Sequence, residues 1–413
     1  MASLSLGLGF VAPMIHGAAK PLFFQDNEMY DIRKYLSEIL YTKEEVDSWL
    51  AGKAFPFSKY HSEFGWLLNN AHFRDGVNKS NSIYTYECDN GPRIMNNYKE
   101  MDCRINTYGD SFTQCHQVSD HETWQEIIAA HIQEPVRNFG IGAWSVYQSY
   151  LRMLTEEEKT PAEYIIFNIF EDDHKRNLDS WRNIRVRKHP QHIESTLPYV
   201  KVNVAEDKII EFPNPCPTKN SLYQLCDLDK AYKLFKDDFV LNIMVTHKNS
   251  KNKNANEAYS NLDELIKIHG IATKLDHYNS ISEKAAAIHL NAALLTTTKI
   301  VEKIEVFAKK HNKKTLYVFS YPAKSIAKFI TEGTRADSDF IEFMKNNKLN
   351  YVDLLEAHAS DFSEYRLEIK DYLRKYFIGH YNPLGNFFCA SRIEGKLIKL
   401  LNPKPFPYRE LSK

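Results

Sequence analysis

The sequence predicts an α/β fold, in which a mostly parallel sheet is covered by helices on both faces, preceded by an N-terminal α+β extension. From residue 101 onward, short runs rich in β-branched and aromatic residues alternate with longer segments of helical periodicity. Parallel strands need long crossover connections, and helices supply these connections and cover the sheet. The length of 413 residues and the hydrophobic content of 43% are sufficient for a large buried core.

Residues 1–100 are predicted to form the N-terminal extension. Two helices are expected at residues 30–40 and 42–50, the second with Thr42 as its N-cap. Residues 82–94 contain an Asp-Asn-Gly turn between two β-prone runs, which is typical of a hairpin. The extension should therefore contain helices followed by short strands that pack on the main domain.

Residues 101–413 are predicted to form the main domain, with an insertion at about residues 178–280 that builds a lid or one wall of a pocket. Strands are predicted at residues 103–108, 135–142, 164–170, 314–322 and 349–357. Helices are predicted at residues 119–133, 144–154, 281–311 and 385–401. The first of these helices has Ser119 and Glu122 in capping-box spacing.

Composition and charge argue against several classes of function. The 53 basic residues are balanced by 53 acidic residues, so no basic excess points to a nucleic-acid partner. The six cysteines include no Cys-x-x-Cys pair, which argues against a zinc ribbon or a thioredoxin-type site. No segment is long and apolar enough to predict a transmembrane span.

The first 24 residues bear on the compartment. They contain a short apolar stretch but no basic start, and Pro13 and His16 interrupt the stretch. We therefore expect a cytoplasmic protein, with export through a signal peptide as the alternative.

Polar residues and glycines follow the predicted strands, where the carboxyl ends of parallel strands gather binding groups. They are Ser111 after the first strand, Asn138, Gly140 and Gly142 in the turn that ends the second, Asp172, Asp173 and His174 after the third, and His380 before the last helix. A serine becomes a nucleophile when a histidine accepts its proton, and the amides of a glycine-rich loop can hold the resulting oxyanion.

Four segments, YGDSFTQCHQVSDHETW, NFGIGAWSVYQ, IIFNIFEDDHKRN and GHYNPLGNFFCA, resemble in this order the sequence blocks of the SGNH (GDSL) hydrolase superfamily. The resemblance covers about residues 80–413. It implies a three-layer flavodoxin-like fold and serine-dependent hydrolysis of acyl esters without an organic cofactor. By this matching, Ser111 would be the nucleophile and His380 the general base. The amides of Ser111 and of the Gly142–Ala143 turn would hold the oxyanion.

The third block departs from the family pattern at Asp172, where the family has an asparagine whose side chain donates to the oxyanion. An ionised carboxylate cannot donate a hydrogen bond. Asp172 could serve if burial or its neighbour Asp173 kept it protonated, or if it held a cation. A solvated loop and the first turn of a helix are the alternative interpretations of this acidic segment.

The fourth block lacks the family's aspartate shortly before the histidine, because Phe377 and Ile378 occupy those positions. Asp353, Glu356 or a backbone carbonyl are the candidate replacements, and a Ser-His dyad is the remaining alternative.

Aromatic residues surround the predicted site. Trp144 follows Ala143 and should narrow the pocket, while Phe112 and Tyr147 suit an acyl chain or a sugar ring. His116 and His121 are expected at the surface near the mouth of the site.

We therefore predict an esterase acting on a small-molecule, carbohydrate or lipid ester, with no metal and no organic cofactor. The alternatives are non-hydrolytic chemistry on the same scaffold, such as a lyase, an acyltransferase or a metal-assisted reaction, and a catalytically silent binding domain. Ser111 as a simple helix cap, and residues 138–142 as a simple tight turn, are the corresponding structural interpretations.

Overall fold

The computed structural model describes residues 30–53, 56–186, 195–203, 206–250, 262, 266 and 279–409. The N-terminal segment that bears on export lies outside the described residues, as does part of the predicted insertion. No helix in the described ranges is long and apolar enough to cross a bilayer.

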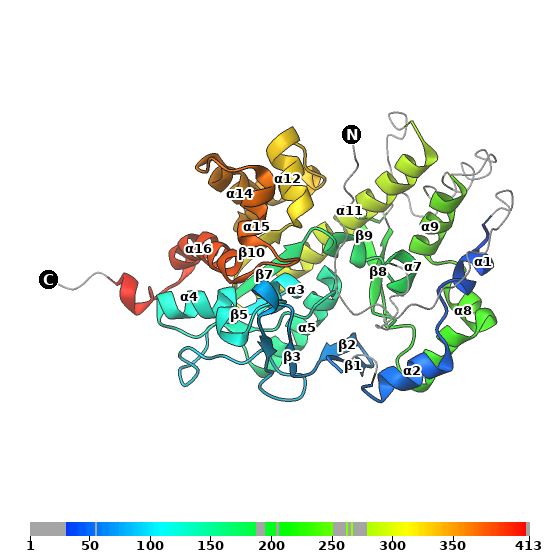
Figure 1. The fold of residues 1–413 in the computed structure, drawn as a ribbon, viewed down its shortest axis with the longest axis horizontal. Coiled ribbons are helices and arrows are strands. Elements are labelled where there is room, and N and C mark those ends of the chain that lie inside the picture. Colours follow the sequence, from blue (N-terminus) through cyan, green and yellow to red (C-terminus); the bar gives the residue numbers. More distant parts are fainter. Residues whose placement is uncertain are drawn as a thin grey trace.

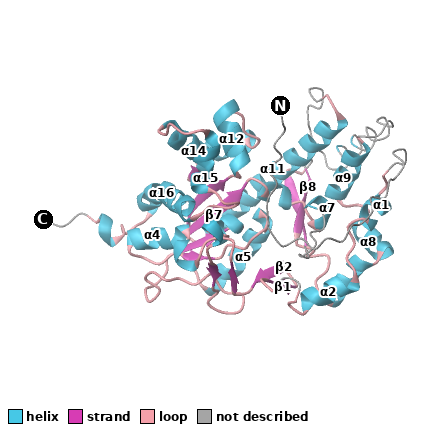
Figure 2. Ribbon diagram, viewed as in Figure 1, coloured by secondary structure: helices cyan, strands magenta, loops and turns pink. Residues whose placement is uncertain are grey.

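A five-stranded sheet forms the centre of the molecule (Figures 1 and 2). Its strands are β5 (Ile105–Tyr108), β6 (Arg137–Asn138), β7 (Tyr164–Phe170), β10 (Lys314–Ser320) and β11 (Tyr351–Asp353). All neighbouring pairs are parallel, and the order is β11-β10-β7-β5-β6. Counted along the chain this order is 2-1-3-4-5, which is the flavodoxin-like arrangement. The predicted α/β fold with a flavodoxin-like parallel sheet is therefore confirmed.

Helices cover both faces of this sheet. Helices α4 (Trp124–Ile132) and α16 (Pro383–Leu400) pack against each other, and α5 (Val146–Lys159) packs against α11 (Ile281–Lys310). The connection through α4 runs from β5 to one side, whereas those through α5 and α11 run to the other side. Because parallel crossovers are right-handed, α5 and α11 lie on the face opposite α4. The result is a three-layer arrangement.

Several predicted strands are shorter than expected. β6 contains only two residues, because the glycines that follow form a turn. β11 ends at Asp353, whose carboxylate accepts from the backbone N–H of Leu355 and starts helix α14 (Leu354–Ser363). Leu354 and Leu355, predicted as strand, therefore belong to a helix.

The remaining helices of the main domain are short. They are α3 (Ser111–Gln114), α6 (Asp173–Arg176), α7 (Asn183–Val186), α12 (Ala323–Glu332), α13 (Ser338–Asn346) and α15 (Ile369–Tyr376). The helix predicted at residues 119–133 is divided into a 3₁₀ turn, Asp120–Glu122, and α4. Thr123 separates them because it is extended and caps α4, while the predicted capping box of Ser119 and Glu122 is confirmed.

A second hydrophobic core joins the N-terminal segment to the insertion. It combines α1 (Ile32–Ser37), α2 (Lys43–Leu50), β1 (Ser58–His61) and β2 (Gly65–Leu68) with β8 (Tyr199–Asn203), α8 (Leu228–Phe235) and α9 (Phe239–Asn249). Strand β9 (Lys208–Phe212) pairs with β8, but its Ile209 belongs to the core of the central sheet. Thr42 is the N-cap of α2, as predicted, and it also forms a capping box with Glu45. Helix α11 links the two cores, because its first half packs in this one and its second half on the sheet. The division of the chain at residue 100 stays a prediction.

The predicted hairpin at residues 82–94 forms differently. β4 (Ser82–Tyr84) pairs with β3 (Ala71–Phe73), and a single bridge joins Tyr86 to Arg93. The backbone N–H of Arg93 donates to the carbonyl of Asn138 at 2.8 Å, so residue 93 adds an antiparallel bridge beside β6. The extension therefore reaches the edge of the central sheet.

Candidate active site

Ser111 lies just beyond the carboxyl end of β5, at the first position of α3. Gly109 has a φ of +151°, and a Cβ there would lie 2.7 Å from the carbonyl oxygen of Asn168, so only glycine fits this turn. Asp110 is the N-cap, and its carboxylate accepts from the backbone N–H of Phe112 at 2.8 Å. The interpretation of Ser111 as the helix cap is therefore wrong. Its hydroxyl lies 3.2 Å from Asp110 Oδ2, to which it can donate, and it also faces a second partner.

That partner is His380, which lies 269 residues further along the chain. Its Nε2 is 2.8 Å from the Ser111 Oγ. His380 occupies a turn between α15 and α16, and Asn382 caps α16 immediately after it. The doubly wound topology thus brings together Ser111 and His380, which are the two predicted site residues furthest apart in the sequence.

The other ring nitrogen of His380 faces an amide. The Nδ1 atom is 3.4 Å from Oε1 of Gln117, and this oxygen also accepts from the backbone N–H of His380 at 2.8 Å. Gln117 lies within the first block of the resemblance, but it was not singled out from the sequence, because the family pattern assigns no role to the position six residues after the serine. The two acidic candidates lie elsewhere: Asp353 pairs with Arg335 at 2.7 Å, and Glu356 approaches the same guanidinium at 3.8 Å.

The ring of His380 is half-buried in an aromatic setting. Its centroid lies 5.2 Å from that of Phe112 and 5.0 Å from that of His116. Burial, followed by the fields of His116 and Arg176, lowers the pKa of His380 well below its usual value. The imidazole is therefore neutral at neutral pH, as a general base must be.

His116 differs from the expectation of a surface group. It is half-buried, and its Nδ1 lies 3.3 Å from the Tyr84 hydroxyl. Burial lowers the pKa of His116 to about 4, although the nearby Asp75 acts in the opposite direction. His121 is exposed, as expected.

Arg93 holds the loop that carries His116 and Gln117. Its guanidinium donates to the carbonyls of Gln114, Cys115 and Val118 at 2.6 to 3.0 Å. Buried carbonyls need donors, and the fully buried Arg93 supplies them where the chain leaves α3. The N-terminal segment thus shapes the loop next to the site.

The predicted oxyanion turn lies against Ser111. A Cβ built on Gly142 would be 3.8 Å from the Ser111 Cβ, and Ala143 has a φ of +68°. Asn138 fixes the start of the turn, since its Oδ1 accepts from the Gly140 N–H at 2.9 Å. The turn-forming role of these residues and a role of their amides near Ser111 are compatible.

The pocket role predicted for Trp144 is not supported. Its side chain is fully buried and packs on Phe64 with ring centroids 5.1 Å apart. Phe64 belongs to the N-terminal segment, which covers the indole and which the sequence could not place here. Tyr147 lines a different hollow, described below.

Asp172 faces two arginines. Its carboxylate contacts Arg185 at 2.8 and 3.0 Å and Arg176 at 3.0 Å. Burial alone would raise the pKa of Asp172, but the two guanidiniums hold it well below the usual range. The lowered pKa does not support a protonated Asp172, which was one of the two conditions under which this residue could serve the oxyanion, and the cations it contacts are side chains of the protein.

Asp173 and Arg176 reach Ser111 only through Asp110, which lies 3.2 Å from the Ser111 Oγ. Arg176 Nη1 lies 2.6 Å from Asp173, 3.2 Å from Asp110 and 3.1 Å from the carbonyl oxygen of Trp144. Burial, followed by the charge of Asp110, raises the pKa of Asp173 well above its usual value, and burial also raises the pKa of Asp110. Within the described part of the chain, no three His, Cys, Asp or Glu side chains gather as metal ligands.

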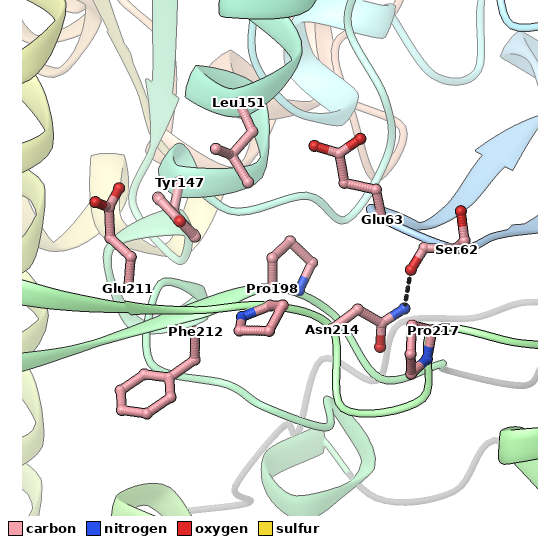
Figure 3. A pocket seen from close by; sticks show the side chains of 10 residues that line it. Ser62, Glu63, Tyr147, Leu151, Pro198, Glu211, Phe212, Asn214 and Pro217 are labelled. Atoms are coloured by element: carbon pink, nitrogen blue, oxygen red, sulfur yellow. Dashed lines mark hydrogen bonds between the residues drawn. The ribbon is translucent and has the colours of Figure 1, made fainter.

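A hollow of about 450 Å³ lies between α5, the β8–β9 hairpin and the β1–β2 turn (Figure 3). Its walls include Glu63, Tyr147, Leu151, Glu211 and Phe212. The insertion thus forms one wall of a hollow, but neither Ser111 nor His380 is among the residues that line it.

Comparisons with known proteins add little to this geometry. No protein-family model matches the chain, and no curated protein matches it at a significant level. One solved structure, of a proposed lipolytic protein of the G-D-S-L family from Desulfitobacterium hafniense DCB-2, is 8% identical with a TM-score of 0.29. That match covers 71% of this chain and 98% of the other. A TM-score this low does not establish a common fold.

Proposed function

We propose that the chain is a serine hydrolase of the SGNH type that cleaves or transfers acyl esters. The observation that supports this proposal most is the 2.8 Å contact between Ser111 Oγ and His380 Nε2. A nucleophile and its base need this separation for proton transfer. The contact lies at the carboxyl end of the sheet, where flavodoxin-like folds bind ligands.

In the proposed reaction, Ser111 Oγ attacks the ester carbonyl while His380 Nε2 takes the hydroxyl proton. When the C–O bond to the leaving group breaks, His380 returns this proton to the departing alcohol, and an acyl-Ser111 intermediate remains. Water, or an acceptor alcohol in a transfer reaction, then gives its proton to His380 and attacks the acyl carbonyl. Breakage of the acyl–Oγ bond and return of the proton regenerate the Ser111 hydroxyl.

The oxyanion of each tetrahedral intermediate would be held by backbone donors. The N–H groups of Ser111 and of the Gly142–Ala143 turn are the proposed ones, because that turn lies against the serine. The Asp172 carboxylate is engaged by Arg185 and Arg176, so it is not assigned a donor role. Asp173 would act through Arg176, by holding the guanidinium that contacts Asp110.

Covalent labelling tests the proposal. A fluorophosphonate should modify the native protein once, and mass spectrometry should map the adduct to Ser111, because only a serine paired with a base is sufficiently nucleophilic. Ser111→Ala should abolish labelling, whereas a variant of an exposed serine, Ser363→Ala, should retain it. A native protein that takes up no label, or takes it up at another residue, would contradict the proposal and favour a silent binding domain.

Asp172→Asn tests whether this position acts on the oxyanion. We expect kcat/KM for p-nitrophenyl acetate to change less than about tenfold, or about 1.4 kcal/mol, because the side chain is directed at arginines. An asparagine that donated to the oxyanion would instead raise kcat/KM by roughly 10²-fold. Steady-state kinetics of the two proteins at one pH distinguish these outcomes.

A further inference from the structure

We propose that the side-chain amide of Gln117 positions His380 and fixes its tautomer. In a Ser-His-Asp arrangement a carboxylate has this role. The inference rests on the proposed function, because it concerns the base of that reaction. It assigns a positioning role to a residue that touches His380 and not the reacting atoms.

The orientation of the Gln117 amide follows from two partners with fixed roles. The backbone N–H of His380 can only donate, and it lies 2.8 Å from Oε1. The backbone carbonyl of Asp75 can only accept, and it lies 3.2 Å from Nε2. Exchanging the oxygen and nitrogen of the amide would break both contacts, so the atom that faces the imidazole is the oxygen.

The tautomer of His380 follows in turn. Its Nδ1 is 3.4 Å from that oxygen, and two acceptors would repel each other at this separation, so Nδ1 carries the proton. In a neutral imidazole, Nε2 then presents its lone pair to the Ser111 hydroxyl at 2.8 Å. This is the arrangement in which the serine proton can pass to the histidine.

The position of Gln117 is itself firmly built. Its φ is +72°, and its backbone N–H donates to the Tyr84 hydroxyl at 2.6 Å. Opposite it, Gly379 has a φ of +127°, and a Cβ at that residue would lie 2.7 Å from the Gln117 oxygen. A glycine beside the histidine is therefore required for the amide to approach.

The charge around the histidine differs from that of a Ser-His-Asp arrangement. The groups facing His380 are His116 on the same loop as Gln117, Arg176 from α6 and the Ser111 hydroxyl. Asp75 lies 3.7 Å from His116, and Asp110 lies 3.2 Å from the Ser111 Oγ. No carboxylate in the described ranges is hydrogen-bonded to His380. The imidazolium formed during the reaction would therefore be stabilised by an amide dipole and not by an ion pair.

Two substitutions separate a positioning role from a general structural one. Gln117→Ala should lower kcat/KM for p-nitrophenyl acetate roughly 10²-fold, the loss typical of a misplaced catalytic group. Gln117→Glu retains an oxygen for His380 and adds a charge that favours the imidazolium. It should raise the midpoint of the acid limb of the kcat/KM profile by about one pH unit or more. Activity falls below this limb because the base becomes protonated.

Gln133 provides the matched control. It is an exposed glutamine that also has a positive φ, +57°, so Gln133→Ala and Gln133→Glu reproduce the backbone effect and the charge change away from the site. Both should retain the wild-type rate and profile.

A readout independent of turnover is the ¹⁵N NMR signature of His380. In the wild type it should show protonated Nδ1, and in Gln117→Ala it should show a mixture of tautomers. Wild-type kinetics and an unchanged tautomer in Gln117→Ala would overturn the inference, as would an acid limb that does not move in Gln117→Glu. A wild type that shows the Nδ1–H tautomer but takes up no fluorophosphonate would instead contradict the proposed function alone.

Discussion

His380→Ala is expected to lower kcat/KM for p-nitrophenyl acetate by about 10⁴-fold or more, because Ser111 loses the acceptor of its proton. Most of the loss should be in kcat, since the histidine acts in the chemical step. The free energy of unfolding should change little, because the side chain is only half-buried and its ring nitrogens contact only Ser111 and Gln117. Steady-state kinetics and urea unfolding of the same preparation measure the two quantities.

The double variant Ser111→Ala with His380→Ala gives a sharper result. Groups that act as one unit are not additive, so the double variant should be about as inactive as either single variant. His131→Ala is a suitable control, because that histidine is exposed and pairs with Glu394 at 2.8 Å. A small loss in His380→Ala, or additive losses in the double variant, would exclude the Ser-His pair as the reacting unit.

Arg176→Met should destabilise the fold by roughly 3–5 kcal/mol at pH 7.5, because it leaves buried carboxylates without their cation. The guanidinium lies 2.6 Å from Asp173 and 3.2 Å from Asp110, and both acids are buried. The pKa values of both acids are already raised, and removal of the cation should raise them further. Protonation of Asp173 and Asp110 at lower pH removes the buried negative charges that the variant leaves without a cation. The loss of stability should therefore be smaller at pH 5 than at pH 7.5. Urea unfolding at the two pH values measures it.

Arg33→Met is the control for this substitution. Arg33 pairs with Asp229 at 2.7 Å, but the two side chains are 47% and 82% exposed. Exposed pairs contribute little, so the loss of stability should be far smaller than in Arg176→Met. Equal losses in the two variants, or a loss in Arg176→Met that grows as the pH falls, would show that the buried ion network does not carry the stability assigned to it.

The central sheet could be predicted from the sequence because its longest strands are nearly continuous apolar runs. β7 and β10 are buried on both faces. A strand buried on both faces is a nearly continuous run of apolar residues, and such a run is visible in the sequence without knowledge of the tertiary structure. The strand ends could not be predicted as well. Leu354 and Leu355 suit a strand or a buried helix equally, and the cap formed by Asp353 decides for the helix.

The candidate site was predictable where the chemistry is local. Ser111 follows a strand and a glycine turn, and His380 precedes a helix start, and both signals lie within a few residues. Gln117 was not predictable, because its contact with His380 depends on a left-handed backbone and on Arg93, Tyr84 and Gly379. The environment of Asp172 was missed for the same reason, since Arg185 reaches it only through the fold.

The bridge between Arg93 and Asn138 has a consequence for self-association. β6 is the outermost strand at its end of the sheet, and unpaired amides and carbonyls on such a strand invite pairing with another copy of the chain. The backbone N–H of Arg93 donates to the Asn138 carbonyl along this outer edge of the sheet. Removal of the N-terminal segment would therefore expose hydrogen-bonding groups at the edge of β6 and favour aggregation of the remaining chain.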